Sequence, residues 1–172
     1  LGMGVIPSDR GHQGFIADLS IRDNLYIGRQ RESSFSSGPL LKTKQIAKYT
    51  RELFDEYNVR AESFDIRAGS LSGGNQQKVV IAREFNMPDL KFVLACQPTR
   101  GLDIGAIEFT HNMLLKLRNE GKAILLISAD LEEIMKLSDR VVVIYDGKIL
   151  ANKSRSEITM EEIGLKMGGV AS

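Results

Sequence analysis

Residues 71–78, with the sequence LSGGNQQK, carry the pattern in this chain that is best suited to binding an anion. A hydroxyl and two glycines, at Ser72, Gly73 and Gly74, stand directly before the helix predicted for residues 75–85. The start of a helix has backbone N–H groups without partners and a partial positive charge, and glycine lets a phosphate approach the backbone. The spacing predicts a phosphate site, while helix caps and turns, which use the same residue types, are the alternative.

A second group of polar residues follows the apolar strand predicted for residues 91–96. The chain there reads CQPTRGLDIGA from Cys96 to Ala106. At the end of an apolar strand, Cys96 is interpreted as a small buried residue and not as a reactive nucleophile. The two histidines are expected on the surface, His12 in a polar loop and His111 on the exposed side of a helix.

Together these segments resemble the ATPase subunits of ABC transporters. LSGGNQQK is similar to their signature motif, the strand at 91–96 to their Walker B strand, and Gly101-Leu102-Asp103 to their D-loop. The sequence PTRGLDIGA at residues 98–106, together with VIPSDR at residues 5–10, most resembles the second nucleotide-binding half of simple-sugar or nucleoside importers. The resemblance covers nearly the whole chain in the family's order.

In that family ATP lies between two nucleotide-binding halves that face each other head to tail. The resemblance implies that Ser72, Gly73 and Gly74 contact the γ-phosphate of ATP held by the partner half, and that Asp103 crosses to the same site. The residues assigned to ATP binding in trans are Leu71, Ser72, Gly73, Gly74, Asn75, Gln76 and Asp103. The alternatives are a solvated helix face for Gln76 and Lys78, and a helix N-cap for Asp103.

The chain departs from the family's pattern where its own hydrolysis chemistry is expected. Cys96 and Gln97 replace the Asp-Glu pair of the Walker B strand. Ala129 stands at the position of the switch histidine, and Ser8 at a Q-loop-like position that often holds glutamine. A thiol is a poor ligand for Mg²⁺, and an amide cannot accept a proton at neutral pH. Losing a general base costs about 10²–10⁴ in rate. We therefore expect no intact catalytic residue here, a degenerate own site, and Mg²⁺ at the partner's site only.

Composition narrows the classes of function. The 172 residues contain one cysteine, which excludes an internal disulfide framework and fits a reducing cytosol. A net charge of +1, without a long basic block, gives no reason to expect nucleic-acid binding. No apolar run reaches the roughly 18–20 residues of a membrane helix. No phosphate-binding loop of the GxxxxGK(S/T) type is present, so the resemblance implies the C-terminal part of the second nucleotide-binding domain, inactive by itself.

Periodicity and turn signals predict the elements that position these residues. Residues 43–57 form an amphipathic helix, and a short helix is expected at 23–30 and a flexible connector at 33–39. Further strands are predicted at 2–7, 123–128, 140–145 and 148–151, a hairpin turn at Asp146-Gly147, and helices at 105–119, 131–137 and 160–167. Alternating strands and helices predict an α/β fold with a mainly parallel sheet and flanking helices. By resemblance this is a partial P-loop-type ABC ATPase domain with a helical subdomain.

The expected organisation has three parts. Residues 1–19 hold the opening strand and the Q-loop-like region. Residues 20–87 form the helical subdomain, which carries the signature motif and contacts the membrane partner. Residues 88–172 belong to the α/β core, with the Walker B-like strand, the D-loop, and the C-terminal hairpin and helix.

The resemblance implies an ATP-binding, energy-coupling component of an importer for simple sugars or nucleosides, at the cytoplasmic face of the membrane. The expected partners are the other nucleotide-binding half, integral-membrane permease subunits and, indirectly, an extracytoplasmic solute-binding protein. Two alternatives are an ABC-type ATPase half outside transport and a catalytically silent α/β interaction module. The short connection at 119–122 leaves no room for the long insert of chromosome-maintenance ATPases. Because unpaired sheet edges recruit other strands, we also expect the fragment to self-associate.

Overall fold

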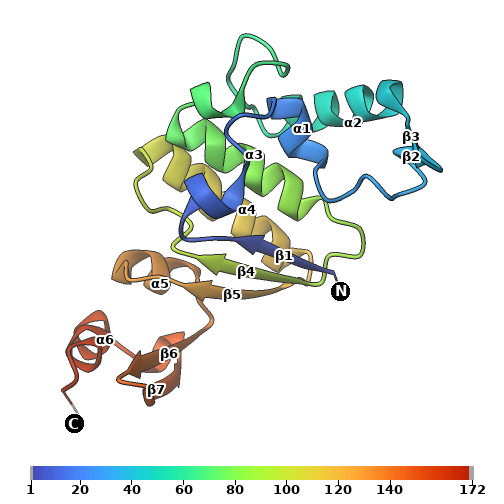
Figure 1. Cartoon of the computed structure of the whole chain (residues 1–172). Coiled ribbons are helices and arrows are strands. Elements are labelled where there is room, and N and C mark those ends of the chain that lie inside the picture. Colours follow the sequence, from blue (N-terminus) through green and yellow to red (C-terminus); the bar gives the residue numbers. More distant parts are fainter. Residues whose placement is uncertain (1, 171–172) are drawn as a thin grey trace. The chain divides into compact units, whose positions relative to one another are not determined.

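The computed structural model describes residues 2–170 (Figure 1). The chain divides into two compact units, one ending at Leu125 and the other beginning at Leu126. Within the described residues, none of the helices combines the length and the apolar composition that crossing a membrane requires. The three-part organisation at residues 19/20 and 87/88 stays a prediction.

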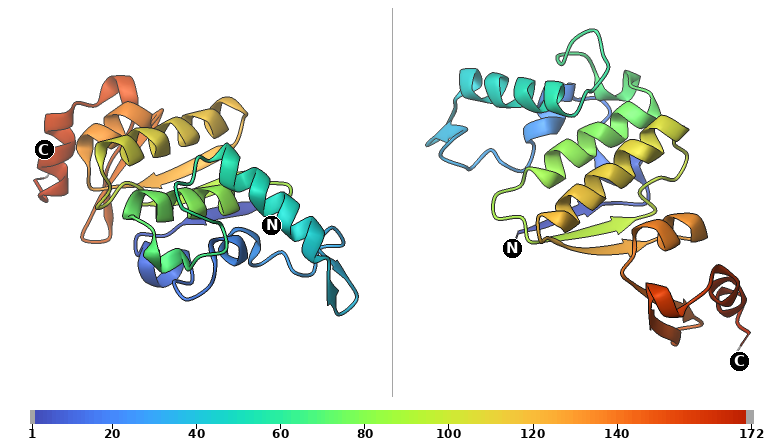
Figure 2. Two further views of the ribbon diagram at one scale, coloured as in Figure 1. Left: turned by 90° about the horizontal axis from the view of Figure 1, so that it is seen from above. Right: turned by 180° about the vertical axis from the view of Figure 1, so that it is seen from behind.

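A three-stranded sheet in the order β1-β4-β5 forms one layer of the first unit. β1 (Met3–Ile6) pairs in parallel with β4 (Phe92–Cys96), and β5 (Ala123–Ile127) is the other neighbour of β4. Two helices, α3 (Gly73–Phe85) and α4 (Ile104–Asn119), lie side by side over one face of β1 and β4 (Figures 1 and 2). The mainly parallel sheet with flanking helices is therefore confirmed.

The remaining elements of the first unit are short, apart from one helix. A π-helical turn (Arg10–Gly14) follows β1, and α1 (Ile21–Tyr26) begins after Ser20, whose Oγ accepts a hydrogen bond from the Asp23 amide. α2 (Thr43–Glu56) buries the apolar side predicted for it. A 3₁₀ turn (Ala68–Ser70) leads into the start of α3.

The flexible connector predicted for residues 33–39 is wrong, because residues 36–41 form a small hairpin. β2 (Ser36–Ser37) pairs antiparallel with β3 (Leu40–Leu41), and the Lys42 amide donates to the Phe35 carbonyl at 2.8 Å. Phe35 is buried, and the Arg29 guanidinium lies 4.9 Å from its ring centroid. The serine-rich composition of this stretch did not indicate a hairpin with a buried aromatic residue.

The second unit is a hairpin with helices. β6 (Arg140–Tyr145) and β7 (Lys148–Ser154) pair antiparallel, and the Asp146-Gly147 turn has φ values of 45° and 71°, as the hairpin signal predicted. α5 (Leu131–Leu137) precedes the hairpin, and a 3₁₀ turn (Arg155–Glu157) and α6 (Met160–Met167) follow it. Its core consists of Val141, Val143, Ala151, Ile158 and Ile163.

The predicted position of one histidine is wrong. His111 is 6% exposed in α4, not on the outer side of the helix. Leu114 and Leu117 are also buried in α4, and His111 precedes the first of them by three residues. Residues at this spacing share one helix face. His12 lies on the surface, as predicted.

Candidate functional site

The predicted signature segment forms the exposed start of α3. Ser72 is its N-cap, and the Ser72 Oγ accepts from the Asn75 amide at 3.5 Å and from Asn75 Nδ2 at 3.1 Å. The helix begins at Gly73, two residues before the predicted start, so both glycines belong to its first turn. Their N–H groups are therefore among those that a helix leaves without an internal acceptor.

The two glycines have different neighbours. A Cβ at Gly74 would lie 2.9 Å from the Ala106 Cβ and 3.1 Å from Asp103 Oδ2. A Cβ at Gly73 would lie 3.0 Å from Arg10 Nη2. Only glycine at position 74 lets the starts of α3 and α4 approach this closely.

The loop between β4 and α4 brings the predicted D-loop residue beside the signature segment. Asp103 is the N-cap of α4, and its Oδ1 accepts from the Ala106 amide at 2.9 Å. Gln77 of α3 also contacts this loop, because its buried Nε2 donates to the Pro98 carbonyl at 2.8 Å. The Oδ1 atom of Asp103 makes the helix-cap hydrogen bond that the alternative interpretation predicted. The Oδ2 atom lies on the side of Gly74.

Gln76 and Lys78 are half-exposed, and both make contacts within the protein. Gln76 Nε2 donates to the Leu71 carbonyl at 3.0 Å, and Gln76 Oε1 accepts from Arg10 Nε at 3.4 Å. Lys78 Nζ donates to the Asn58 carbonyl at 2.8 Å and lies 5.1 Å from the Phe109 ring centroid. Burial, followed by the charge of Arg60, lowers the pKa of Lys78.

Arg10 adds a positive charge to this region, and sequence analysis missed it. Its half-buried guanidinium makes the Nε bond to Gln76, and within residues 2–170 its side chain donates no other hydrogen bond. Burial lowers the pKa of Arg10. The remaining N–H groups of the guanidinium are thus available beside Gly73. The arginine of the VIPSDR segment was visible in the sequence, but its contact with α3 could not be predicted because the two segments are far apart along the chain.

Two of the positions at which the sequence predicts replaced catalytic groups, Ser8 and Gln97, follow the ends of neighbouring strands. Ile6 is opposite Ala95 in the parallel pair, so Ser8 and Gln97 come two residues after paired positions. Gln97 has a φ of 48°. Cys96 is half-buried, whereas the sequence predicted a buried residue. Asp9 caps the π-helical turn, and hydrogen bonds from His12 lower the pKa of that carboxyl. Cys96, Gln97 and Ser8 offer a thiol, an amide and a hydroxyl but no carboxylate, so these three residues fit a hard cation such as Mg²⁺ poorly.

Ala129 lies in the second unit, exposed between β5 and α5. Its neighbours cap α5: the Asp130 Oδ1 accepts from the Glu132 amide at 2.9 Å and from the Glu133 amide at 3.1 Å. Ser128 Oγ accepts from the Asp130 amide at 3.0 Å. A methyl group at position 129 cannot donate, accept or transfer a proton.

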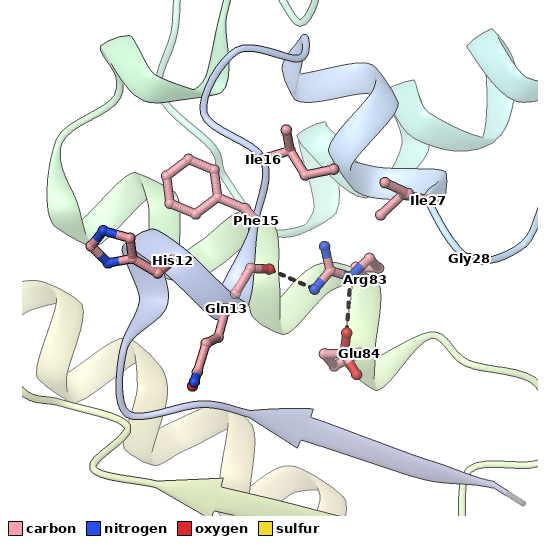
Figure 3. Close-up of a pocket in the computed structure, with 9 residues that line it drawn as sticks. His12, Gln13, Phe15, Ile16, Ile27, Gly28, Arg83 and Glu84 are labelled. Carbon is pink, nitrogen blue, oxygen red and sulfur yellow. Dashed lines mark hydrogen bonds and ion pairs between the residues drawn. The ribbon is translucent and has the colours of Figure 1, made fainter.

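A pocket of about 340 Å³ lies in the first unit beside the π-helical turn (Figure 3). Apolar side chains of Phe15, Ile16 and Ile27 line it together with the charged pair Arg83 and Glu84. Arg83 Nη2 donates to the Gly14 carbonyl at 2.6 Å, and Glu84 Oε1 accepts from Arg83 Nε at 2.9 Å. The C-terminal part of α3 is thereby tied to the segment that also carries Arg10.

Curated relatives match almost the whole chain. The guanosine import ATP-binding protein NupO of Bacillus subtilis is 46% identical over 169 residues, which are 98% of this chain and 33% of NupO. The nucleoside import ATP-binding protein NupA of Lactococcus lactis is 42% identical, over 97% of this chain and 33% of NupA. The chain is a homologue of importer ATP-binding proteins. A ribose import ATP-binding protein, RbsA of Bacillus cereus, is 38% identical over 95% of this chain and 33% of RbsA.

This homologue of importer ATP-binding proteins spans about a third of the length of those relatives. No family model matches the chain. Among solved structures, an ABC transporter of metal-chelate type in an inward-facing conformation has a TM-score of 0.77 at 17% identity, covering 99% of this chain and 65% of that one. A dimeric ATP-binding cassette with ADP and phosphate bound has a TM-score of 0.70 at 22% identity, covering 89% and 62%. The fold is that of an ABC ATPase domain, which confirms the resemblance.

Proposed function

We propose that the chain is part of the ATP-binding component of an importer for nucleosides or simple sugars. It supplies the Ser72-Gly73-Gly74 helix start to ATP that is held by another nucleotide-binding half. The observation that carries this proposal is the exposed start of α3, with Asp103 packed against it. The guanosine, nucleoside and ribose import proteins to which the chain is homologous support the substrate class.

The start of α3 has the properties of a phosphate site. Its first N–H groups and the helix dipole favour an anion, and neither Gly73 nor Gly74 adds a side chain of its own at the helix start. The guanidinium of Arg10 beside Gly73 adds a full positive charge. Leu71, Asn75 and Gln76 make hydrogen bonds within this turn, and the proposal assigns Asp103 the contact across to the other half.

The positions that match the family's catalytic groups carry no general base in this chain. Gln97 cannot take a proton from an attacking water at neutral pH, and neither Ser8 nor Ala129 can replace it as a base. Because the donor set of Cys96, Gln97 and Ser8 does not fit Mg²⁺, we assign the metal to the partner's site. The assembled pair then has one working site, and hydrolysis there serves transport.

The proposed partners follow from the importer assignment. They are the second nucleotide-binding half, the integral-membrane permease subunits and, through the permease, an extracytoplasmic solute-binding protein. The component would act at the cytoplasmic face of the membrane, with residues 20–87 toward the permease.

Substitutions in the full-length protein, assembled with its permease, test the proposal. Ser72→Arg places a bulky cation at the helix start and should abolish transport-linked ATP hydrolysis. Ser70→Arg is the matched control, since this exposed side chain lies two residues before the N-cap and should leave the rate unchanged. Gln97→Ala should change the rate little.

Each outcome bears on a separate part of the proposal. Full activity of Ser72→Arg would refute the supply of the signature in trans. A large loss with Gln97→Ala would refute the degenerate site. A catalytically silent interaction module would show no nucleotide-dependent association with another ATPase half.

A further inference from the structure

The orientation of the Asn75 side-chain amide is fixed by its two neighbours. The Arg60 backbone N–H donates to Asn75 Oδ1 at 2.9 Å, and Asn75 Nδ2 lies 3.1 Å from Ser72 Oγ. A backbone N–H can only donate, so the oxygen of the amide must face Arg60 and the NH₂ group must face Ser72. The usual ambiguity between the oxygen and the nitrogen of an asparagine is thus removed.

This orientation determines what the Ser72 hydroxyl can do. A hydroxyl has two acceptor lone pairs and one hydrogen to donate. Both N–H groups that approach Ser72 Oγ come from Asn75, its backbone amide at 3.5 Å and its Nδ2 at 3.1 Å. With its lone pairs turned toward Asn75, the hydroxyl directs its hydrogen away from the helix, into the exposed space at the start of α3.

We infer that Asn75 is a positioning residue that presets the Ser72 hydroxyl as a donor to the γ-phosphate of ATP. The inference rests on the proposed function and adds a role to it. Terminal phosphate oxygens accept hydrogen bonds, so a hydroxyl that already points its hydrogen outward needs no reorientation when ATP arrives. Donors held in place before binding contribute more than donors that must first be ordered.

The loop before the signature segment supports Asn75 from behind. Asn75 Oδ1 accepts a hydrogen bond from the Arg60 amide, and Lys78 Nζ donates one to the Asn58 carbonyl at 2.8 Å. These two bonds join residues 58–60 to the first turns of α3. A side chain whose oxygen is held by Arg60 and whose nitrogen is held by Ser72 acts on the nucleotide through Ser72.

Two substitutions at position 75 separate this role from simple helix packing. Asn75→Ala removes the donor to Ser72, and we expect kcat/KM for ATP to fall about 5–10-fold, the effect of one hydrogen bond. Asn75→Asp keeps the side-chain shape and one oxygen that accepts from the Arg60 amide. Its second oxygen, however, accepts the hydroxyl hydrogen of Ser72 and so directs that hydrogen away from the nucleotide. Asn75→Asp should therefore lose more than Asn75→Ala, on the order of 10²-fold, because a charge-assisted bond is the stronger competitor.

The experiment is a double-mutant cycle in the full-length protein with its permease. Ser72→Ala, Asn75→Ala and the double variant are compared by kcat and KM for ATP, with thermal unfolding as a check on folding. If Asn75 acts through the Ser72 hydroxyl, Asn75→Ala costs nothing further once Ser72 is alanine. Additive losses, or equal losses for Asn75→Ala and Asn75→Asp, would overturn the inference while leaving the proposed function standing. Full activity of Ser72→Ala would overturn both.

Discussion

The close approach of α3 and α4 predicts that Gly74→Ala destabilises the protein, although alanine usually favours helices. The new Cβ would lie 2.9 Å from the Ala106 Cβ, an atom that no rotamer change can move aside. Gly73, Gly74 and Gly105 all have negative φ values, so backbone strain is not the cause. The start of α3 must instead shift away from Asp103 and α4.

The magnitude follows from two opposing effects. Overpacking a close contact costs about 1–3 kcal/mol, and replacing a helical glycine by alanine gains about 0.5–1 kcal/mol. We expect a net loss of about 1–2 kcal/mol for Gly74→Ala. Gly105→Ala is the matched control in the first turn of α4, because its Cβ would meet only Asp103 Oδ1, at 3.5 Å. Gly73→Ala lies between, since Arg10 can move its flexible end.

Urea unfolding followed by circular dichroism measures this series. The predicted order of stability is Gly105→Ala, then Gly73→Ala, then Gly74→Ala, with the last below the unsubstituted protein. A Gly74→Ala variant as stable as Gly105→Ala would refute the reasoning from the Cβ distance. The close approach of the two helix starts would then be wrong, and with it the contact between the signature segment and Asp103.

Three further predictions concern the interior, the pH dependence and the sheet edges. Gln77→Ala removes the donor to the buried Pro98 carbonyl and should cost about 1–3 kcal/mol in urea unfolding, whereas Gln45→Ala on the exposed side of α2 should cost almost nothing. Burial raises the pKa of Tyr57 from 10.0 to about 12, so the folded state keeps a proton that the unfolded chain loses. The contribution of Tyr57 to stability should therefore fall by about 2–3 kcal/mol as the pH rises through this window, and Tyr57→Phe should remove this part of the fall, while the part from Tyr49, whose pKa burial also raises, remains; an unchanged pH profile in Tyr57→Phe would contradict it. Because β1 and β5 each have one neighbour in the three-stranded sheet, the chain should self-associate, and a single monomeric species in light scattering would count against this.

The sequence predicted elements wherever local signals decide them. The i, i+3 and i+4 apolar spacing of residues 43–57 and the Asp146-Gly147 turn each act within a few residues, so their positions agree with the structure. The start of α3 was placed two residues late because Gly73 and Gly74 have low helix propensity, which packing against α4 overrides.

Contacts between distant segments could not be read from the sequence. Arg10 and Gln76 are 66 positions apart, and Gln77 and Pro98 are 21 positions apart. His111 was misplaced because a polar residue was assumed to face solvent, although its spacing placed it on the apolar side. The residues of the signature segment were predicted from their pattern, but the Arg60–Asn75 hydrogen bond that fixes the Asn75 amide depends on the fold.

A structure of the full-length protein with its permease and a non-hydrolysable ATP analogue tests the central claim most directly. We predict that the Ser72 hydroxyl and the N–H groups of Gly73 and Gly74 lie about 3 Å from γ-phosphate oxygens of a nucleotide held by the other half. A nucleotide-bound complex in which this helix start faces no triphosphate would contradict the account.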